Sequence, residues 1–275
     1  MLTSKMFLPN FQLSNWIKAY WFLIGNGIGE NKIAKRILQD GCATIFIVIE
    51  GSLTLSLFEN RSFKRGIYIM PPLDSHEAYI SDDFYAIDIH FNPSIFYQLF
   101  KIPAIEFSNK IYTAKDLGVQ FDETLIDKIN DTKHNISKVN NIINSYFLEL
   151  FNKNKFYADE LISNINGLYK DGDLNRFFKE QNLSIRQIER KVKDFTGLTP
   201  KNISRIGRFY SVLDFMKFRQ FNIDFNELTL KHNFSDQSHF IREFKHFTND
   251  TPNRFVKGSN NFPQFKGLCN LTKII

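Results

Sequence analysis

A pattern that occurs twice near the C-terminal end constrains this chain more than any other feature. Residues 183–200 (LSIRQIERKVKDFTGLTP) and 235–252 (SDQSHFIREFKHFTNDTP) align at an offset of 52 residues. At that offset Arg190 matches Arg242, and the pair Ile188 and Val192 matches Phe240 and Phe244. Self-similarity of this kind predicts two copies of one supersecondary unit.

Each copy predicts a short helix with defined ends. The apolar residues recur at helical spacing, i, i+4 and i+7; they are Ile188, Val192 and Phe195, and Phe240, Phe244 and Phe247. Ser184 and Asp236 are residue types that cap helix N-termini. Gly197 and Asn249 tolerate the left-handed C-cap conformation. The Thr-Pro that follows each cap predicts the start of a further helix. We therefore expect helices over 184–195 and 236–247.

The polar faces of these two helices carry side chains that suit nucleic-acid contact. They are Arg186, Arg190 and Lys193 in the first copy, and Gln237, Ser238, Arg242 and Lys245 in the second. Residues 183–219 contain nine basic and three acidic side chains, a balance equal to the +6 of the whole chain. Basic and amide side chains contact phosphates and base edges, so double-stranded DNA is the expected partner.

A long helical pattern over 201–220 separates the two copies. About 20 residues at ~1.5 Å each span ~30 Å, close to the ~34 Å between successive turns of one DNA groove. A rigid helix of this length could place the two predicted helices in neighbouring major grooves.

The N-terminal half is rich in expected strands. Short runs of β-branched, aromatic or alternating residues occur at 18–24, 43–49, 53–57, 66–70 and 84–91. Strands at this spacing predict a barrel or sandwich. Helices are expected at 94–101, 121–129 and 137–151, the last behind Ser137 as its cap. Its apolar stripe either packs on its own domain or forms a homodimer contact. Residues 152–155 are the expected linker.

The remaining features argue against an enzyme or a metal protein. Cys42 and Cys269 are the only cysteines, too few for a disulfide framework or a cysteine-rich metal site. With no signal-peptide core and no membrane-length apolar window, the expected location is the cytoplasm. His76, Glu77 and His90 raise the possibility of a metal-binding cupin, but the His-x-His pattern with a later Glu and His is absent. We expect no catalytic residues, metal or cofactor.

The repeated blocks resemble a known family. Ser184–Arg190 with the following Thr-Gly-Leu-Thr-Pro, and above all Asn233–Lys245, are similar to the AraC/XylS family of transcription regulators. The resemblance covers roughly residues 157–257 and implies seven helices forming two helix-turn-helix units, joined by the helix 201–220. It implies that Gln187, Glu189 and His239 also lie at base-reading positions. Asn233 and Asn249 stand where the family pattern has glycine. Among the other residues, asparagine best tolerates the left-handed backbone conformation.

Two blocks of the N-terminal half, 36–45 and 89–93, resemble the cupin-like sensor or dimerisation domain of some of these regulators. The expectation is thus an α+β chain of two domains: 1–152 a β-rich domain with following helices, 153–258 the DNA-binding module, and 259–275 a tail. The predicted function is sequence-specific transcription regulation, with a small-molecule effector, a homodimer and the transcription machinery as further possible partners. A cupin-type metalloenzyme with a helical appendage and a non-specific architectural DNA binder are the alternatives.

Overall fold

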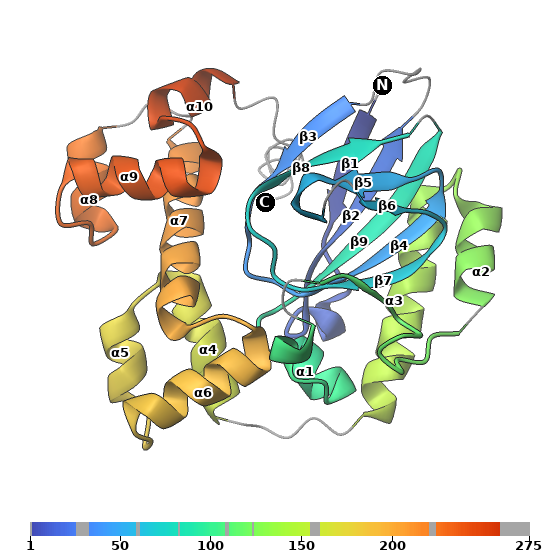
Figure 1. Cartoon of the computed structure of the whole chain (residues 1–275), viewed down its shortest axis with the longest axis horizontal. Coiled ribbons are helices and arrows are strands. Elements are labelled where there is room, and N and C mark those ends of the chain that lie inside the picture. The colour runs from blue at the N-terminus through green and yellow to red at the C-terminus, as the bar shows by residue number, and fades with distance from the viewer. Residues whose placement is uncertain are drawn as a thin grey trace.

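The computed structural model describes residues 2–25, 33–58, 61–81, 83–107, 110–122, 124–154, 160–219 and 224–258. Within these residues the chain forms a β-rich N-terminal part and a helical C-terminal part (Figure 1). The predicted α+β class with two domains is confirmed. No helix among the described residues combines the length and apolarity needed to cross a membrane.

The β-rich part consists of two antiparallel sheets. The six-stranded sheet has the order β1 (Leu2–Phe7), β2 (Ile17–Gly25), β9 (Phe84–Phe91), β4 (Thr44–Glu50), β7 (Gly66–Met70) and β10 (Tyr112–Thr113). The four-stranded sheet has the order β3 (Ile33–Ile37), β8 (His76–Ile80), β5 (Leu53–Leu55) and β6 (Arg61–Phe63). Short 3-10 turns lie at Phe11–Leu13 (η1), Ser56–Phe58 (η2) and Ala104–Glu106 (η3).

The central strands are buried on both faces because each face meets a different core. In β4, Ile45 and Ile47 belong to the core between the six-stranded sheet and the helices, whereas Phe46 and Val48 belong to the core between the two sheets. This placement agrees with the almost continuously apolar run 43–49, which is typical of a strand buried on both faces.

Helix α1 (Ile95–Phe100) follows β9, and helices α2 (Thr124–Thr132) and α3 (Ile136–Lys153) follow β10. The prediction that Ser137 caps the last of these was wrong: Asn135 is the cap, and its side chain accepts from Lys138 N–H. The stripe Val139, Ile143, Phe147 and Phe151 is buried in the core of its own domain. The apolar stripe of α3 therefore packs on its own domain. This was the first of the two predicted roles, the other being a homodimer contact.

The helical part contains α4 (Glu160–Asp171), α5 (Leu174–Lys179), α6 (Ile185–Thr196), α7 (Pro200–Phe218), α8 (Phe225–Lys231), α9 (Gln237–Thr248) and α10 (Pro252–Gly258). Figure 1 shows α7 joining α4–α6 at one end to α8–α10 at the other. Each end has its own core: Ile203 of α7 packs in the first, and Phe209, Leu213 and Met216 pack in the second. Lys155 of the predicted linker, Gln220 and the tail 259–275 lie outside the described residues.

Candidate functional site

The first repeated helix, α6, begins with a complete capping box. Ser184 Oγ accepts from Gln187 N–H at 3.4 Å, and Gln187 Oε1 accepts from Ser184 N–H at 3.0 Å. Gly197 ends the helix at φ 75°, with its N–H donating to Lys193 O. These caps satisfy backbone groups that a short helix leaves unpaired. The helix runs over 185–196, close to the predicted 184–195.

The second repeated helix, α9, has the same architecture. Asp236 Oδ1 accepts from His239 N–H at 2.7 Å, and Asn249 ends the helix at φ 53°. Asn233, which replaces the glycine of the preceding turn, also has positive φ, 55°. The expectation that asparagine supports these turns is confirmed.

Both helices expose the predicted contact residues along one side and bury the apolar stripe along the other. Ile188 and Val192 of α6, like Phe240 and Phe244 of α9, are buried. The exposed set comprises Arg186, Gln187, Glu189, Arg190 and Lys193 on α6, and Gln237, Ser238, Arg242 and Lys245 on α9. His239 is the exception, because it is half-buried against Phe234 at 5.4 Å between ring centroids. The structure thus brings the predicted residues together as two separate exposed faces.

Two of the predicted contact residues already have local partners. The Gln187 side chain completes the capping box of α6, and His239 Nδ1 lies 3.2 Å from Ser235 Oγ. Each side chain therefore helps to fix the first turn of its helix. Whether Gln187 and His239 also contact bases stays a prediction, and so do the DNA contacts of the other eight residues.

The helical part contacts the β-rich part at both ends of α7. Near α6, Phe195 stacks on Tyr97 of α1 at 4.6 Å between ring centroids. Near α9, Ser75 Oγ donates to Phe247 O at 2.6 Å. Leu38 packs into the apolar core of the second unit. Since both helix-turn-helix units contact the β-rich part, a change in that part can reach both.

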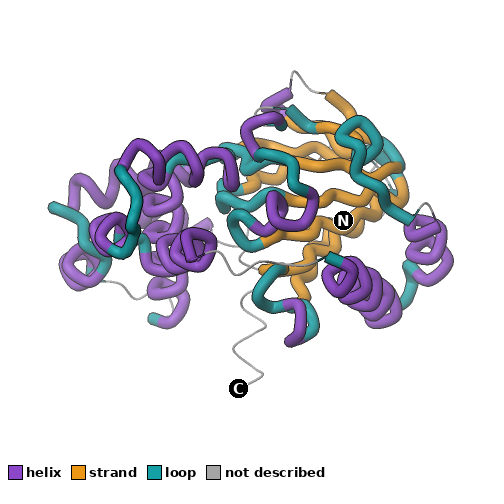
Figure 2. The backbone as a smooth tube through the Cα atoms, turned by 90° about the horizontal axis from the view of Figure 1, so that it is seen from below, coloured by secondary structure: helices purple, strands orange, loops and turns teal. Residues whose placement is uncertain are grey.

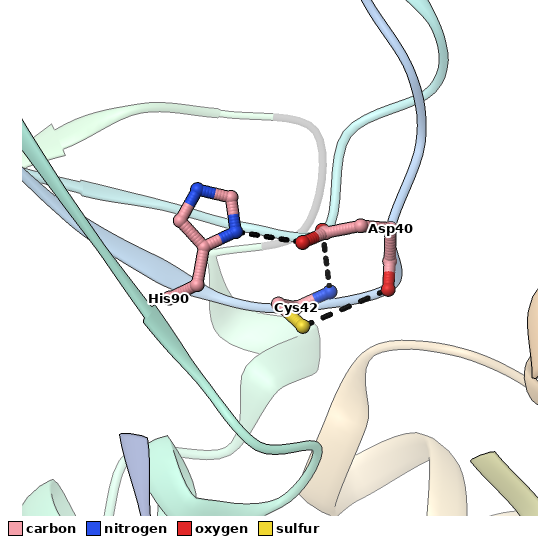
Figure 3. A group of neighbouring side chains, drawn as sticks. All are labelled: Asp40, Cys42 and His90. Atoms are coloured by element: carbon pink, nitrogen blue, oxygen red, sulfur yellow. Dashed lines mark hydrogen bonds and ion pairs between the residues drawn. The ribbon is translucent and has the colours of Figure 1, made fainter. Parts of the chain in front are cut away.

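A partly buried polar cluster lies between the two parts of the chain, and Figure 3 shows its residues Asp40 and His90 beside Cys42. His90 Nδ1 lies 2.6 Å from Asp40 Oδ2, and His90 Nε2 lies 2.8 Å from Asp88 Oδ2. Lys18 Nζ lies 3.5 Å from Asp40 Oδ2 and 2.5 Å from the hydroxyl of Tyr169 on α4. The Tyr169 hydroxyl in turn donates to Asp40 O at 2.6 Å.

The charges of this cluster stabilise one another. Burial by itself disfavours a charged imidazole, but the Asp88 and Asp40 carboxylates raise the pKa of His90 well above its ordinary value. Burial would likewise raise the pKa of Asp40, yet His90 and Lys18 hold that pKa well below its usual range. Burial disfavours the Lys18 ammonium, but its pKa is raised because Cys42 and Asp40 lie beside it. The cluster therefore contains two cations and two carboxylates in mutual contact.

Asp40, Cys42 and His90 form the one group of metal-ligand types found among the described residues, with their ligand atoms within 4.8 Å of one another. Their protein partners make them a poor cation site. Both nitrogens of His90 face carboxylates, and the Lys18 ammonium lies beside Asp40. A metal ion would have to displace the His90 protons and approach the Lys18 charge, so the arrangement favours a structural hydrogen-bond network.

The cluster borders two cavities. One, of about 100 Å³, lies between the sheets and has apolar walls that include Phe46, Leu55 and Met70. The other, of about 420 Å³, lies between β2 and the helices α4 and α7. Asp40 and His90 line both cavities. A molecule bound in either cavity would therefore touch the network that joins the β-rich part to α4.

His90 was expected only as a possible metal ligand of the cupin alternative, and its contacts with Asp40 and Asp88 were not predicted. One local signal was available: in β9 the side chains Asp88 and His90 alternate on the face of Phe84 and Ala86, which belong to the core between the sheets. Two ionisable groups on that face indicate a buried polar pair. Lys18 and Tyr169 are 151 residues apart, so nothing in the local pattern links them.

Comparison with known proteins gives a family match to the N-terminal half and structural matches to most of the chain. Residues 5–113 match a family described as a domain of unknown function, DUF6597. No curated protein sequence matches the chain.

Among solved structures, apo ToxT K231A from Vibrio cholerae strain SCE256 is 14% identical, with 86% of this chain and 96% of that chain covered and a TM-score of 0.44. ToxT from Vibrio cholerae O395 bound to (E)-4-(8-methylnaphthalen-1-yl)but-3-enoic acid is 13% identical. The match covers 93% of this chain and 98% of that chain, with a TM-score of 0.44. The AraC-like transcriptional activator CuxR is 8% identical. The match covers 96% of this chain and 89% of that chain, with a TM-score of 0.26.

These identities are 14% or lower and the TM-scores lie below 0.5, so the function of this chain has to be argued from its own residues. The motifs of residues 184–200 and 233–252 are what resemble the AraC/XylS family of transcription regulators.

Proposed function

We propose that this protein is a sequence-specific DNA-binding transcription regulator that reads two successive major grooves with α6 and α9. One observation carries the proposal. Two helices with caps and buried apolar stripes at corresponding positions expose Arg190 and Arg242 at matching places, at opposite ends of α7. The 19 residues of α7 span ~28 Å, close to the ~34 Å between turns of one groove.

The chemistry of the two faces supports different roles for their residues. Lys193 and Lys245 suit phosphate contact, which supplies affinity through counterion release. Arg186, Arg190 and Arg242 suit bidentate contact with guanine. Because α6 carries Glu189 where α9 carries Ile241, the two helices should prefer different bases, and the preferred site should be asymmetric.

The test is binding to a preferred duplex selected from random sequences. Arg190→Ala and Arg242→Ala should each weaken binding to that duplex by about 5- to 150-fold, corresponding to ~1–3 kcal/mol. Lys191→Ala removes the same charge from another exposed position of α6 and should preserve the preference for the selected sequence. If neither arginine variant changes the preference, the two-groove proposal is wrong. Equal affinity of the parent protein for all duplexes would instead support the architectural alternative.

We propose further that the β-rich part receives a small-molecule effector in its cavities. This is supported by the position of Asp40 and His90, which line both cavities and hydrogen-bond within the network that reaches Tyr169 of α4. Three further points stay predictions: the domain bounds 1–152 and 153–258, a homodimer, and contact with the transcription machinery.

Metal analysis of the purified protein separates the proposed transcription regulator from the metalloenzyme alternative. That alternative requires a stoichiometric bound metal.

A further inference from the structure

An ion pair joins the second predicted reading helix to the connecting helix. Arg205 lies on α7 and Glu243 on α9. Arg205 Nε donates to Glu243 Oε2 at 2.8 Å, and Arg205 Nη2 donates to Glu243 Oε1 at 2.9 Å. The two side chains are only 25% and 18% exposed. A bidentate pair with this little solvent exposure is geometrically specific and weakly screened by salt.

The surface beneath this ion pair is aromatic. Phe209 of α7 stacks on Phe247 of α9 at 4.5 Å and meets Phe244 edge-on at 5.6 Å between ring centroids. A cavity of about 10 Å³ remains between these rings, bordered by Arg205 and Glu243 themselves. Apolar contact sets the separation of two helices but constrains their relative rotation less than a bidentate hydrogen bond does. The ion pair is therefore a directional restraint made between α7 and α9 themselves.

The first repeated unit lacks a counterpart of this pair. At the 52-residue offset Glu243 matches Lys191, which is exposed. That unit has less need of one, because α6 is joined to α7 directly by the short turn Gly197–Thr199. In contrast, α9 follows α7 in the chain only after α8. The orientation of α9 relative to α7 thus depends on contacts through space.

We infer that the Arg205–Glu243 ion pair is a positioning device that fixes the orientation of α9 on α7 and so sets the spacing between the two DNA segments that the protein reads. This inference rests on the proposed DNA-binding function. In it, Arg205 and Glu243 act through α9 and contact no base themselves. Their loss should therefore change which spacing is accepted more than which bases are preferred within each half-site.

The experiment uses the full chain and a set of duplexes. The set contains the selected preferred duplex and derivatives with one base pair inserted or deleted between the two half-sites. The parent protein should bind each altered duplex at least about tenfold more weakly, as for a mismatched site. Glu243→Gln should bind the preferred duplex more weakly and discriminate among spacings by less than about threefold. The reversed pair Arg205→Glu with Glu243→Arg should restore the spacing preference.

A matched control comes from a second ion pair, which lies just beyond the C-terminal end of α7. Arg219 Nη2 lies 2.5 Å from Glu227 Oε1 of α8, and the two side chains are 46% and 44% exposed. Glu227→Gln removes that exposed pair and should retain the parent spacing preference. Circular dichroism and melting temperature establish that each variant is folded.

Three outcomes overturn the inference. Glu243→Gln could retain the full spacing preference, or it could lose affinity equally on every duplex, as a purely structural role predicts. The reversed pair could also fail to restore the preference while remaining folded. If instead the parent protein shows no sequence preference at all, the proposed function itself fails and the inference fails with it.

Discussion

At the scale of single residues, the cluster of Lys18, Asp40, Asp88 and His90 has the largest electrostatic consequences. A buried charge is tolerated only when partners compensate for the lost hydration. Here each cation contacts a carboxylate, and Tyr169 bonds to both Lys18 and the Asp40 carbonyl. The same few side chains therefore stabilise the β-rich part and connect it to α4.

This cluster predicts a pH dependence of stability. The pKa of His90 is raised in the folded chain, so the folded state holds a proton that the unfolded state releases near pH ~6.5. The His90 contribution is complete below that pH and is lost as the pH rises through the folded pKa. As the pH rises above ~6.5 toward the folded pKa of His90, the free energy of unfolding should fall by up to about 1.4 kcal/mol per pH unit from this group.

Denaturant unfolding of the parent protein and of His90→Gln across this range measures the effect. The difference in stability between the two should shrink as the pH rises. Asp127→Asn is the matched control, because Asp127 forms an exposed ion pair with Arg65 and should give a difference that does not vary with pH. A His90→Gln difference that is equally constant would contradict the prediction.

At the scale of elements, α6 and α9 were predictable because their signals are local. Ser184, Asp236, Gly197 and Asn249 lie within one turn of the helix ends that they define. Strands β3 and β8 were missed for the opposite reason. Each depends on its pairing with the other, Ile33 with Ile80 through Ile37 with His76, and residue patterns within one short segment do not report such a partner.

The caps yield a prediction at this scale. Asp236→Ala removes the acceptor of the His239 N–H, which lies 2.7 Å away, and should cost about 1 kcal/mol of stability. Ser238→Ala, an exposed change in the same turn, should leave stability within about 0.5 kcal/mol of the parent. Thermal or urea unfolding compares the two variants. Equal losses in both would show that Asp236 does not act as a cap.

At the scale of the whole molecule, the proposed reading helices α6 and α9 share one positively charged module that also contacts the β-rich part at two places. Figure 2 shows the helices of the C-terminal part grouped at one side of the strands. The stacking of Phe195 on Tyr97 and the hydrogen bond from Ser75 to Phe247 O involve α6 and α9 respectively. Both proposed reading helices therefore contact the part of the chain that carries the proposed effector cavities.

The charge of the module predicts the salt dependence of DNA binding. If Lys193 and Lys245 neutralise phosphates, alanine at either position should reduce the slope of log affinity against log salt by about one, for any DNA sequence. Lys133→Ala is the control, since Lys133 pairs with Glu50 in the β-rich part at 2.6 Å. Titration at several salt concentrations measures the slopes. A control variant that changes the slope as much as the others would contradict the assignment.

The sequence by itself determined the two capped helices, their matching faces and the length of α7, because helix periodicity and capping depend on residues within a few positions of one another. It also determined that β4 would be buried on both faces. Only the tertiary structure decided that Lys18, Asp40, His90 and Tyr169 meet, that Glu243 binds Arg205, and that the α3 stripe packs on its own sheet. These contacts join residues far apart in the chain. They form only when folding brings the distant segments together and removes water from the groups involved.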